Sequence, residues 1–213
     1  MRLYLSSFKI GNQPQKLTEL MGSNPKKAAL ILNALDYKPE SRTKFLATET
    51  EMLKGLGFEV DELDLRKYFG KKDELKNFLK NRGLVWINGG NTFLLRRAMK
   101  QSGFDNVIKK LLAEDKIVYA GFSAACAVLH KDLHGIEFSD DPNVIAEGYD
   151  REIIWDGLGL LDFNIAVHYA SDHPESEAAN EEIEYYKKNS IPYKPLRDGE
   201  VIVISGDNVE IIK

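Results

Sequence analysis

The stretch "KIVYAGFSAACAVLH", residues 116–130, decides the fold and raises the question of function. An apolar run over 116–121 ends in a glycine, and a series of small residues that favours a helix begins just after Ser123. A serine at this junction has two interpretations. Its hydroxyl can cap the helix. Alternatively, a strained strand-to-helix turn, a nucleophile elbow, can expose the hydroxyl above a sheet, with the N–H of Ala124 directed at a developing oxyanion.

Short apolar runs and longer amphipathic segments alternate through the first 130 residues. Parallel strands need crossovers of a dozen residues or more, and right-handed crossovers place helices on both faces of the sheet. The sequence therefore predicts an α/β fold with a doubly wound, mostly parallel sheet sandwiched by helices. The strands are expected at 3–7, 28–35, 58–65, 84–89 and 116–121, and the helices at 41–57, 73–83, 91–103 and 105–115.

Helix ends and the last third of the chain are assigned from turn and capping residues. Ser41 and Asp73 are expected as N-caps, and Gly83 as a helix stop. Residues 135–161 are assigned to loops and short strands, 162–170 to a strand ending at His168, and 174–190 to a helix with Pro174 in its first turn. The segment 199–213 is expected to form a hairpin about Gly206, Asp207 and Asn208. No linker interrupts the chain, so a single domain over 1–213 is predicted.

Composition excludes several classes of function. A net charge of −4 and scattered Lys and Arg residues argue against a nucleic-acid partner. The single cysteine, Cys126, excludes an internal disulfide and argues against a thiolate metal site. The chain shows neither a signal-peptide pattern at its start nor 18 consecutive apolar residues, so we expect no membrane association and a cytoplasmic location.

A second strand end, "INGGNTF" at 87–93, carries a glycine pair followed by a helix that Asn91 or Thr92 could cap. Ligands collect at the carboxyl ends of parallel strands. Without β-carbons, the turn can be sharp and its N–H groups can face a cleft. The alternative is an ordinary tight turn between strand and helix.

A nucleophilic serine needs a base, and four histidines are available. His130 lies two helical turns beyond Ser123, about 10 Å along the axis, which is too far for a hydrogen bond. His134 lies in a polar stretch and is expected in solvent. His168, at a strand end, is the preferred base, and His173 is the second choice. The acid that would orient the imidazole is Asp198 or Glu137. Asp140 and Asp141 precede Pro142 and are interpreted as turn residues.

The motifs "INGGNTFLL", "YAGFSAACAV" and "VHYASDHP", in this order and spacing, resemble the peptidase E family of serine peptidases. These are aspartyl dipeptidases related to the cyanophycinases, and the resemblance spans most of the chain. It implies a flavodoxin-like or class I glutamine amidotransferase-like sheet. It also implies Ser123 as nucleophile, His168 as general base, and the N–H groups of Gly90 and Ala124 as oxyanion hole. No cofactor or metal is implied.

Two features of the site differ from the family pattern: the acid that would orient His168, and the second glycine of the elbow around Ser123. The family's acidic segment matches "LRDG" at 196–199 with Asp198 in place of glutamate, and Asp198 is preferred over Glu137. Ala125 replaces the second glycine of the elbow, where its methyl group could narrow the site. Cys126 could act as a thiol nucleophile, but we expect it one turn into the helix, facing the sheet.

Three functions are carried forward. The preferred one is a serine peptidase that hydrolyses dipeptides with N-terminal Asp through an acyl-enzyme on Ser123. Its partner is a small peptide, and the protein is a monomer or homodimer. The second is a cyanophycinase-like or other amide or ester hydrolase using the same serine. The third is a non-catalytic anion- or nucleotide-binding domain. An Asp substrate needs a cation, for which Arg96, Arg97, Lys131 and Arg151 are candidates; the alternative for both helix arginines is a solvated face.

Overall fold

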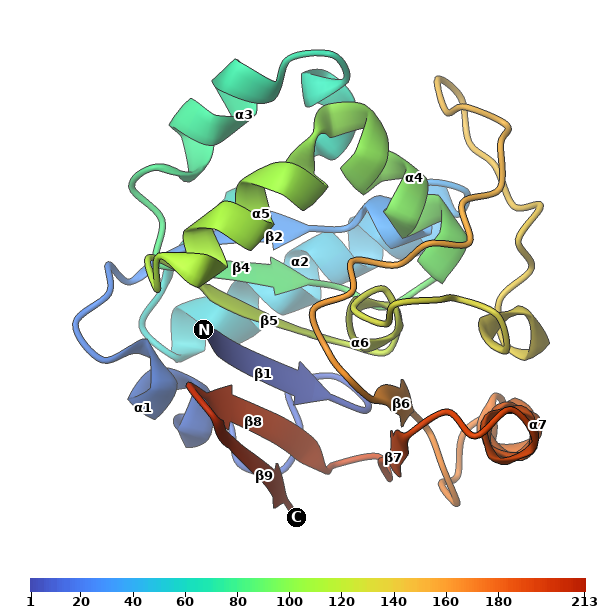
Figure 1. Ribbon diagram of the computed structural model, residues 1–213. Helices are drawn as coiled ribbons and strands as arrows, with labels where there is room; N and C mark the ends of the chain where they lie inside the picture. The colour runs from blue at the N-terminus through green and yellow to red at the C-terminus, as the bar shows by residue number, and fades with distance from the viewer.

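The computed structural model describes residues 1–213 and is built on a seven-stranded sheet, ordered β3-β2-β4-β5-β1-β8-β9 (Figure 1). The first five strands in this order run parallel, and β8 and β9 are antiparallel additions at one edge. The predicted mostly parallel sheet is therefore confirmed. The strands are β1 (Arg2–Ser6), β2 (Lys27–Ile31), β3 (Glu59–Glu62), β4 (Leu84–Ile87), β5 (Val118–Phe122), β8 (Val201–Ser205) and β9 (Asn208–Ile212).

Helices cover both faces of this sheet, as the doubly wound prediction requires. The α-helices are α1 (Gln15–Met21), α2 (Pro39–Gly55), α3 (Lys72–Leu79), α4 (Thr92–Ser102), α5 (Phe104–Ala113), α6 (Ala124–Ala127) and α7 (Ser176–Lys188). Three 3₁₀ turns are η1 (Asn33–Leu35), η2 (Leu65–Tyr68) and η3 (Ile136–Phe138). None of these helices combines the length and apolar composition that crossing a bilayer requires.

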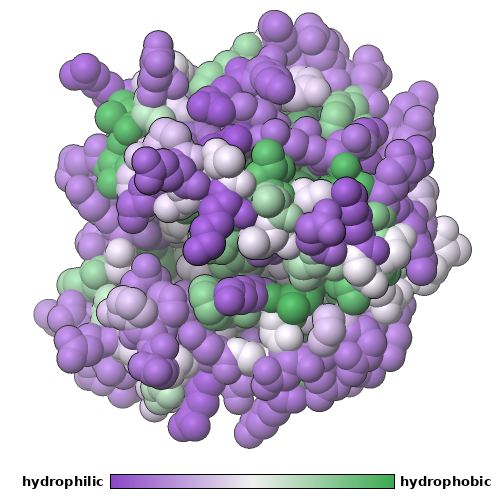
Figure 2. All heavy atoms as spheres, turned by 180° about the vertical axis from the view of Figure 1, so that it is seen from behind, coloured by the Kyte–Doolittle hydropathy of each residue, from purple (hydrophilic) through white to green (hydrophobic).

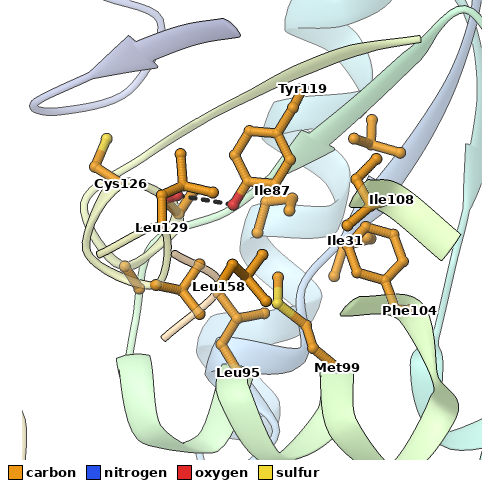
Figure 3. Close-up of a cluster of buried hydrophobic side chains, with 14 of the residues drawn as sticks. Ile31, Ile87, Leu95, Met99, Phe104, Ile108, Tyr119, Cys126, Leu129 and Leu158 are labelled. Carbon is orange, nitrogen blue, oxygen red and sulfur yellow. Dashed lines mark hydrogen bonds between the residues drawn. The ribbon is translucent and has the colours of Figure 1, made fainter. Parts of the chain in front are cut away.

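Alternate side chains of each strand belong to two separate cores. One core lies under α3, α4, α5 and α6, and β1 contributes Leu3 and Leu5 to it. Figure 3 shows its centre, where Met99 and Phe104 of the helices pack against Ile31 and Ile87 of the strands. The other core lies under α1 and α2 and takes the intervening residues, such as Tyr4. Strands buried on both faces explain the nearly continuous apolar runs in the sequence.

A small second sheet, separate from the seven-stranded one, is formed by strands that follow β5 in the chain. It consists of β6 (Asn164–Ala166) and β7 (Tyr193–Pro195), which run parallel, with α7 between them in sequence. Figure 1 shows this unit beside the start of β8, below α6. His168 lies two residues beyond β6, so the predicted strand at 162–170 is too long and does not end at His168. Its backbone instead turns through a positive φ of 60°.

Several predicted boundaries are wrong because capping and strand propensities were overridden locally. Pro39 begins α2 with Lys38 at the N-cap, so Ser41 lies inside the helix. Lys71 occupies the N-cap of α3, and Asp73 sits in its first turn. The strand predicted at 28–35 stops at Ile31 and continues as η1, and the one at 58–65 stops at Glu62.

Two further predictions for the last third of the chain need correction. Pro174 precedes α7, whose N-cap is Glu175, so the proline is not in the first turn. Residues 139–163 form no strand; one isolated bridge, Asp132 to Asp156, is the only pairing there. Predicted and observed structure agree for the hairpin of β8 and β9, which turns at Gly206 and Asp207.

Gly121 allows β4 and β5 to approach closely just below the elbow. A β-carbon at this position would lie 2.2 Å from the carbonyl oxygen of Ile87 and 2.6 Å from the β-carbon of Ala125. We expect Gly121→Ala to destabilise the protein by about 3 kcal/mol or more, because neither neighbour can yield. Chemical denaturation measures this. The matched control is Gly55→Ala at the end of α2, where nothing lies within 4 Å and the expected change is a gain of up to about 1 kcal/mol. Equal effects of both substitutions would contradict the close-packing argument.

Candidate active site

Ser123 occupies a strained turn between β5 and α6. Its φ of 51° and ψ of −110° lie outside the regions that residues with side chains normally adopt, and its side chain makes no capping hydrogen bond. The helix-cap interpretation of this serine is therefore wrong. Ser123 instead lines a cavity together with Phe122. Strain retained at a cavity wall is typical of functional sites.

The glycine pair after β4 lies directly against this turn. A β-carbon on Gly89 would approach the β-carbon of Ser123 to 3.1 Å, and one on Gly90, with φ 136°, would lie 2.6 Å from the carbonyl oxygen of Ala34. The Asn91 side chain accepts the Leu94 N–H at 2.9 Å and caps α4. Neither the Gly90 N–H nor the Ala124 N–H has a hydrogen-bond acceptor within the chain.

The cavity at this point measures about 170 Å³ and lies at the carboxyl ends of β1, β2, β4 and β5. This is where ligands collect in parallel α/β sheets. Seen from behind, the surface has apolar and neutral residues in hollows between hydrophilic ridges (Figure 2). The cavity is lined by Phe8, Leu35, Tyr37, Lys38, Phe45, Asn88, Gly89, Gly90, Phe122, Ser123, Asp140, His168, His173 and Glu175. A larger groove of about 730 Å³ lies between α3 and α5, is rich in lysines and contains none of these residues.

His168 is held by Asp198 and Ser7. Its Nδ1 lies 2.7 Å from the Oδ1 of Asp198, and its backbone N–H donates to the Ser7 Oγ at 2.8 Å. The same Ser7 hydroxyl donates to Asp198 Oδ1 at 2.9 Å, so one serine from the end of β1 ties the pair together. The imidazole is only 2% exposed. Burial lowers the pKa of His168, and the hydrogen bond from its Nδ1–H to Asp198 opposes part of that effect.

Two further groups contact the His168 ring. The His173 ring stacks on it at 3.7 Å between centroids, with planes within 6° of parallel. The carboxylate of Glu175 lies 3.6 Å from its Nε2. His168 and Ser123 line the same cavity but form no direct hydrogen bond. Catalytic hydrogen bonds are often long without substrate and tighten when it binds.

Glu137 is not paired with His168. It lies in η3 and accepts the N–H of Gly135. Of the two candidate acids, the structure thus places only Asp198 against the imidazole. The remaining histidines are also separate from Ser123. His130 is fully buried and accepts the Ile165 N–H through Nε2, while His134 stacks on Trp155 at the surface.

Ala125 and Cys126 point into the protein. The methyl group of Ala125 is fully buried against Gly121 and does not line the cavity, so it does not narrow the site. The Cys126 Sγ donates to the carbonyl oxygen of Ser6 at 3.2 Å, and burial raises the pKa of this thiol far above its usual range. A thiol held protonated in the core is not a nucleophile. Figure 3 shows Cys126 beside Leu129 in the core cluster.

One group of side chains could hold a metal ion. His168, His173 and Asp198 each offer a ligand atom, and these atoms lie within 4.8 Å of one another. Imidazole lone pairs lie in the ring plane, however, and the two rings are stacked face to face. Both rings can point at one ion only if one of them rotates out of the stack.

The sequence profile of peptidase family S51 matches residues 7–212, nearly the whole chain. The chain belongs to this family. S51 is a family of serine peptidases, and the resemblance to peptidase E is confirmed. The fold also matches a crystal structure of a protein provisionally named peptidase E from Listeria monocytogenes EGD-e. That comparison has a TM-score of 0.80 and 24% identity over 100% of this chain and 98% of that one.

Curated relatives of this S51 protein are distant in sequence. An uncharacterized peptidase of Listeria monocytogenes is 28% identical over 80% of this chain and 78% of its own length. A "probable alpha-aspartyl dipeptidase" of Drosophila melanogaster is 24% identical over 83% of this chain and 70% of its own length. A second solved structure, a peptidase from an acI-B1 actinobacterium, has a TM-score of 0.72 at 15% identity, covering 99% of this chain and 86% of that one.

None of the four basic residues that were candidates for binding an acidic substrate lines the cavity of this S51 chain. Arg97 is 1% exposed and binds the carbonyl oxygens of Pro142, Val144 and Glu152. Arg96 binds the carbonyl oxygen of Asp156 and the carboxylate of Asp105. The solvated-face interpretation of these arginines is therefore wrong as well, because both anchor the long loop after η3.

Sequence reasoning missed most of the charged wall of the cavity. Lys38, at the start of α2, is its one cationic lining residue apart from the histidines. Glu175 precedes α7 in a segment with many acidic residues, so its sequence position did not distinguish it. Asp140, interpreted as a turn residue, instead accepts the Thr92 N–H at 2.8 Å and lines the cavity. Its place at the N-terminus of α4 depends on a contact 48 residues away in sequence, which no local pattern indicates.

Proposed function

We propose that this S51 protein is a serine peptidase that works through a Ser123–His168–Asp198 triad. The main support for this proposal is that Ser123, in its strained turn, and His168, paired with Asp198, line one cavity at the carboxyl ends of the parallel strands. His168 Nε2 takes the proton of Ser123 as its oxygen attacks the peptide carbonyl. Asp198 fixes the tautomer in which Nδ1 carries the proton and stabilises the imidazolium that forms.

The backbone around the elbow supplies the oxyanion hole in this mechanism. The N–H groups of Gly90 and Ala124 are free of internal acceptors; Gly90 lines the same cavity as Ser123 and Ala124 follows Ser123 in the chain, so both can donate to the tetrahedral oxyanion. Collapse of that intermediate releases the amine with the proton from His168 and leaves an acyl-enzyme. Water, deprotonated by His168, then hydrolyses the ester. The chemistry needs no metal or cofactor.

The finer proposal is that the substrate is a dipeptide with N-terminal Asp. It is supported by the family and by the name of the Drosophila relative, and Lys38 offers a cation for the Asp side chain. Another amide or ester hydrolase activity, cyanophycinase-like included, would use the same triad. The anion-binding alternative is disfavoured by the carboxylates in the cavity wall. We retain the predictions of a single domain, a cytoplasmic location and a monomer or homodimer.

Labelling and turnover test the proposal directly. A fluorophosphonate should modify Ser123, identified by peptide mass spectrometry, and the protein should hydrolyse Asp-Leu and Asp-p-nitroanilide undiminished by a chelator. Labelling without turnover of either compound would reject the Asp substrate and keep the nucleophile. Absence of both would reject the peptidase mechanism.

The lowered pKa of His168 sets the acid limb of the pH profile. The base must be neutral, so kcat/KM falls as the pH drops through the pKa of His168. Burial places that pKa below the usual value of about 6.5, so the midpoint of the acid limb should lie below pH 6.5. Steady-state rates from pH 4 to 8 measure this limb. A midpoint above 6.5 would show that burial does not dominate at His168.

Lys38 should matter only for acidic substrates. Because its side chain is exposed, we expect Lys38→Gln to raise the KM for Asp-Leu by about fivefold and leave the KM for Ala-Leu unchanged. Steady-state kinetics with both dipeptides measure the difference. Lys44→Gln, an exposed lysine of α2 that does not line the cavity, is the control. Equal changes for both dipeptides would assign Lys38 a purely structural role at the N-cap of α2.

A further inference from the structure

The peptide bond between Gly89 and Gly90, which carries one of the two proposed oxyanion-hole donors, is held by a single hydrogen bond. The Asn88 Nδ2 donates to the Gly89 carbonyl oxygen at 2.8 Å. The backbone groups of Gly89 and Gly90 make no other hydrogen bond within the chain. The residues on either side are anchored, since the N–H groups of Asn88 and Asn91 each donate at 2.9 Å to carbonyl oxygens of β2 and η1. The glycine peptide is therefore a span between two fixed points.

The hydrogen bond from Asn88 decides which way the Gly90 N–H points. In a trans peptide the C=O and the N–H lie on opposite sides of one plane, and the chain has no cis peptide. The Gly89 carbonyl oxygen is turned toward the Asn88 side chain, which is 1% exposed. The Gly90 N–H therefore points the other way, and Gly90 lines the same cavity as Ser123.

Two adjacent glycines make this peptide plane easy to turn over. Turning the plane by half a turn changes ψ of Gly89 and φ of Gly90, which now has a positive φ of 136°, and glycine accepts both signs of φ. The turned plane would present a carbonyl oxygen where the oxyanion forms. Side chains cannot stiffen the span, because β-carbons here would lie 2.8 Å from the Phe122 ring and 2.6 Å from the Ala34 carbonyl oxygen.

The Asn88 side chain is an unfavourable choice for stability alone. Its Oδ1 is buried with no hydrogen-bond donor in the chain. Buried acceptors without a partner are rare in native proteins because each one destabilises the fold. A polar group that is retained at such a cost beside an active site is typical of a functional role. The donating half of the amide, Nδ2, supplies that role.

We propose that Asn88 is a positioning residue of the oxyanion hole. Its amide holds the Gly89–Gly90 peptide with the Gly90 N–H directed at the oxyanion that forms when Ser123 attacks. Asn88 acts through the peptide bond that follows it and not on the substrate. The inference rests on Ser123 and Gly90 having the roles given under the proposed function.

The ratio of kcat to KM effects separates positioning from binding. Asn88→Ala leaves the Gly89 carbonyl oxygen without its donor, and we expect kcat for Asp-Leu to fall by about 10- to 100-fold. KM should stay within about twofold, because the oxyanion exists only in the transition state. The midpoint of urea denaturation should stay close to that of the parent, since the variant also removes the unpaired Oδ1. Asn81→Ala, at an exposed asparagine shortly before β4, is the matched control and should leave kcat unchanged.

Labelling gives a second readout that does not depend on the substrate. The phosphonyl oxygen of a fluorophosphonate enters the oxyanion hole as Ser123 reacts, so the second-order labelling rate of Asn88→Ala should fall by a similar factor. Calorimetry with Asp-Leu on Ser123→Ala should give the same Kd, within about twofold, with and without Asn88→Ala. Asn88→Leu, which keeps the volume of the side chain and loses the donor, replaces Asn88→Ala in each assay if the latter does not fold.

The outcomes distinguish three results. Equal labelling rates and equal kcat in the parent and in Asn88→Ala would overturn the positioning role. A change confined to KM and to the calorimetric Kd would overturn it as well, because Asn88 would then bind the substrate directly. A parent protein that is not labelled at all would overturn Ser123 as the nucleophile, and the positioning role would fall with the proposed function.

Discussion

Ser123→Ala should lower kcat/KM for peptide hydrolysis by about 10⁴- to 10⁶-fold and abolish labelling by a fluorophosphonate. The substitution removes the only group at the elbow that can form the acyl-enzyme, and loss of a serine nucleophile has effects of this size in unrelated triads. The remaining activity would come from the oxyanion hole and binding alone. Single-turnover assays at high enzyme concentration measure it.

The loss of activity in Ser123→Ala is informative about catalysis only if the variant folds like the parent protein. The Ser123 side chain makes no hydrogen bond in the chain, so its removal should leave the free energy of unfolding within about 0.5 kcal/mol of the parent. Ser205→Ala is a useful comparison, since it removes a serine hydroxyl at the exposed end of β8 that does not line the cavity. A Ser123→Ala variant that retained a tenth of the activity would leave the serine a structural residue of the turn.

Much of the fold was predictable because its signals are local. Strands such as Leu84–Ile87 are buried on both faces and show it as unbroken apolar runs. The elbow is indicated by the small residues after Ser123 and by Gly121, where a side chain would collide with Ile87 and Ala125. Right-handed crossovers place helices on both faces of the sheet, whereas the order of the strands and the two-stranded sheet of β6 and β7 were not predicted.

The site was predictable only where a motif marked it. His168 was identified by its place after a short apolar segment, yet its burial depends on Ser7, 161 residues earlier in the chain. Lys38 at the N-cap of α2 and Glu175 at the N-cap of α7 line the cavity of Ser123, and nothing in their own sequence neighbourhoods distinguishes them from surface charges. Arg97 was misassigned for the same reason, because the loop carbonyl oxygens that bury it are 45 to 55 residues away.

Asp198 owes its position to three hydrogen bonds from different parts of the chain. Its Oδ1 accepts from Ser7 and pairs with His168 Nδ1, and its backbone N–H donates to the Ser171 hydroxyl. An aspartate side chain is one methylene shorter than a glutamate side chain, so its backbone must lie closer to the imidazole. Here the backbone at Leu196 compensates by bonding to Ala166 and Tyr169 on either side of His168, which brings the acid close.

Asp198→Asn should therefore reduce kcat/KM by about 10⁴-fold with little change in stability, because the amide retains the shape but stabilises the wrong imidazole tautomer. The wrong tautomer forms when the amide turns its NH₂ group toward His168 Nδ1; the Ser7 hydroxyl then loses Oδ1 as acceptor but still has the carbonyl oxygen of Leu196 at 3.3 Å, so the loop should keep its place. Asp207→Asn, in the exposed turn between β8 and β9, is the matched control and should retain full activity. Full activity of Asp198→Asn, together with a large loss in Glu137→Gln, would reassign the acid of the triad to η3.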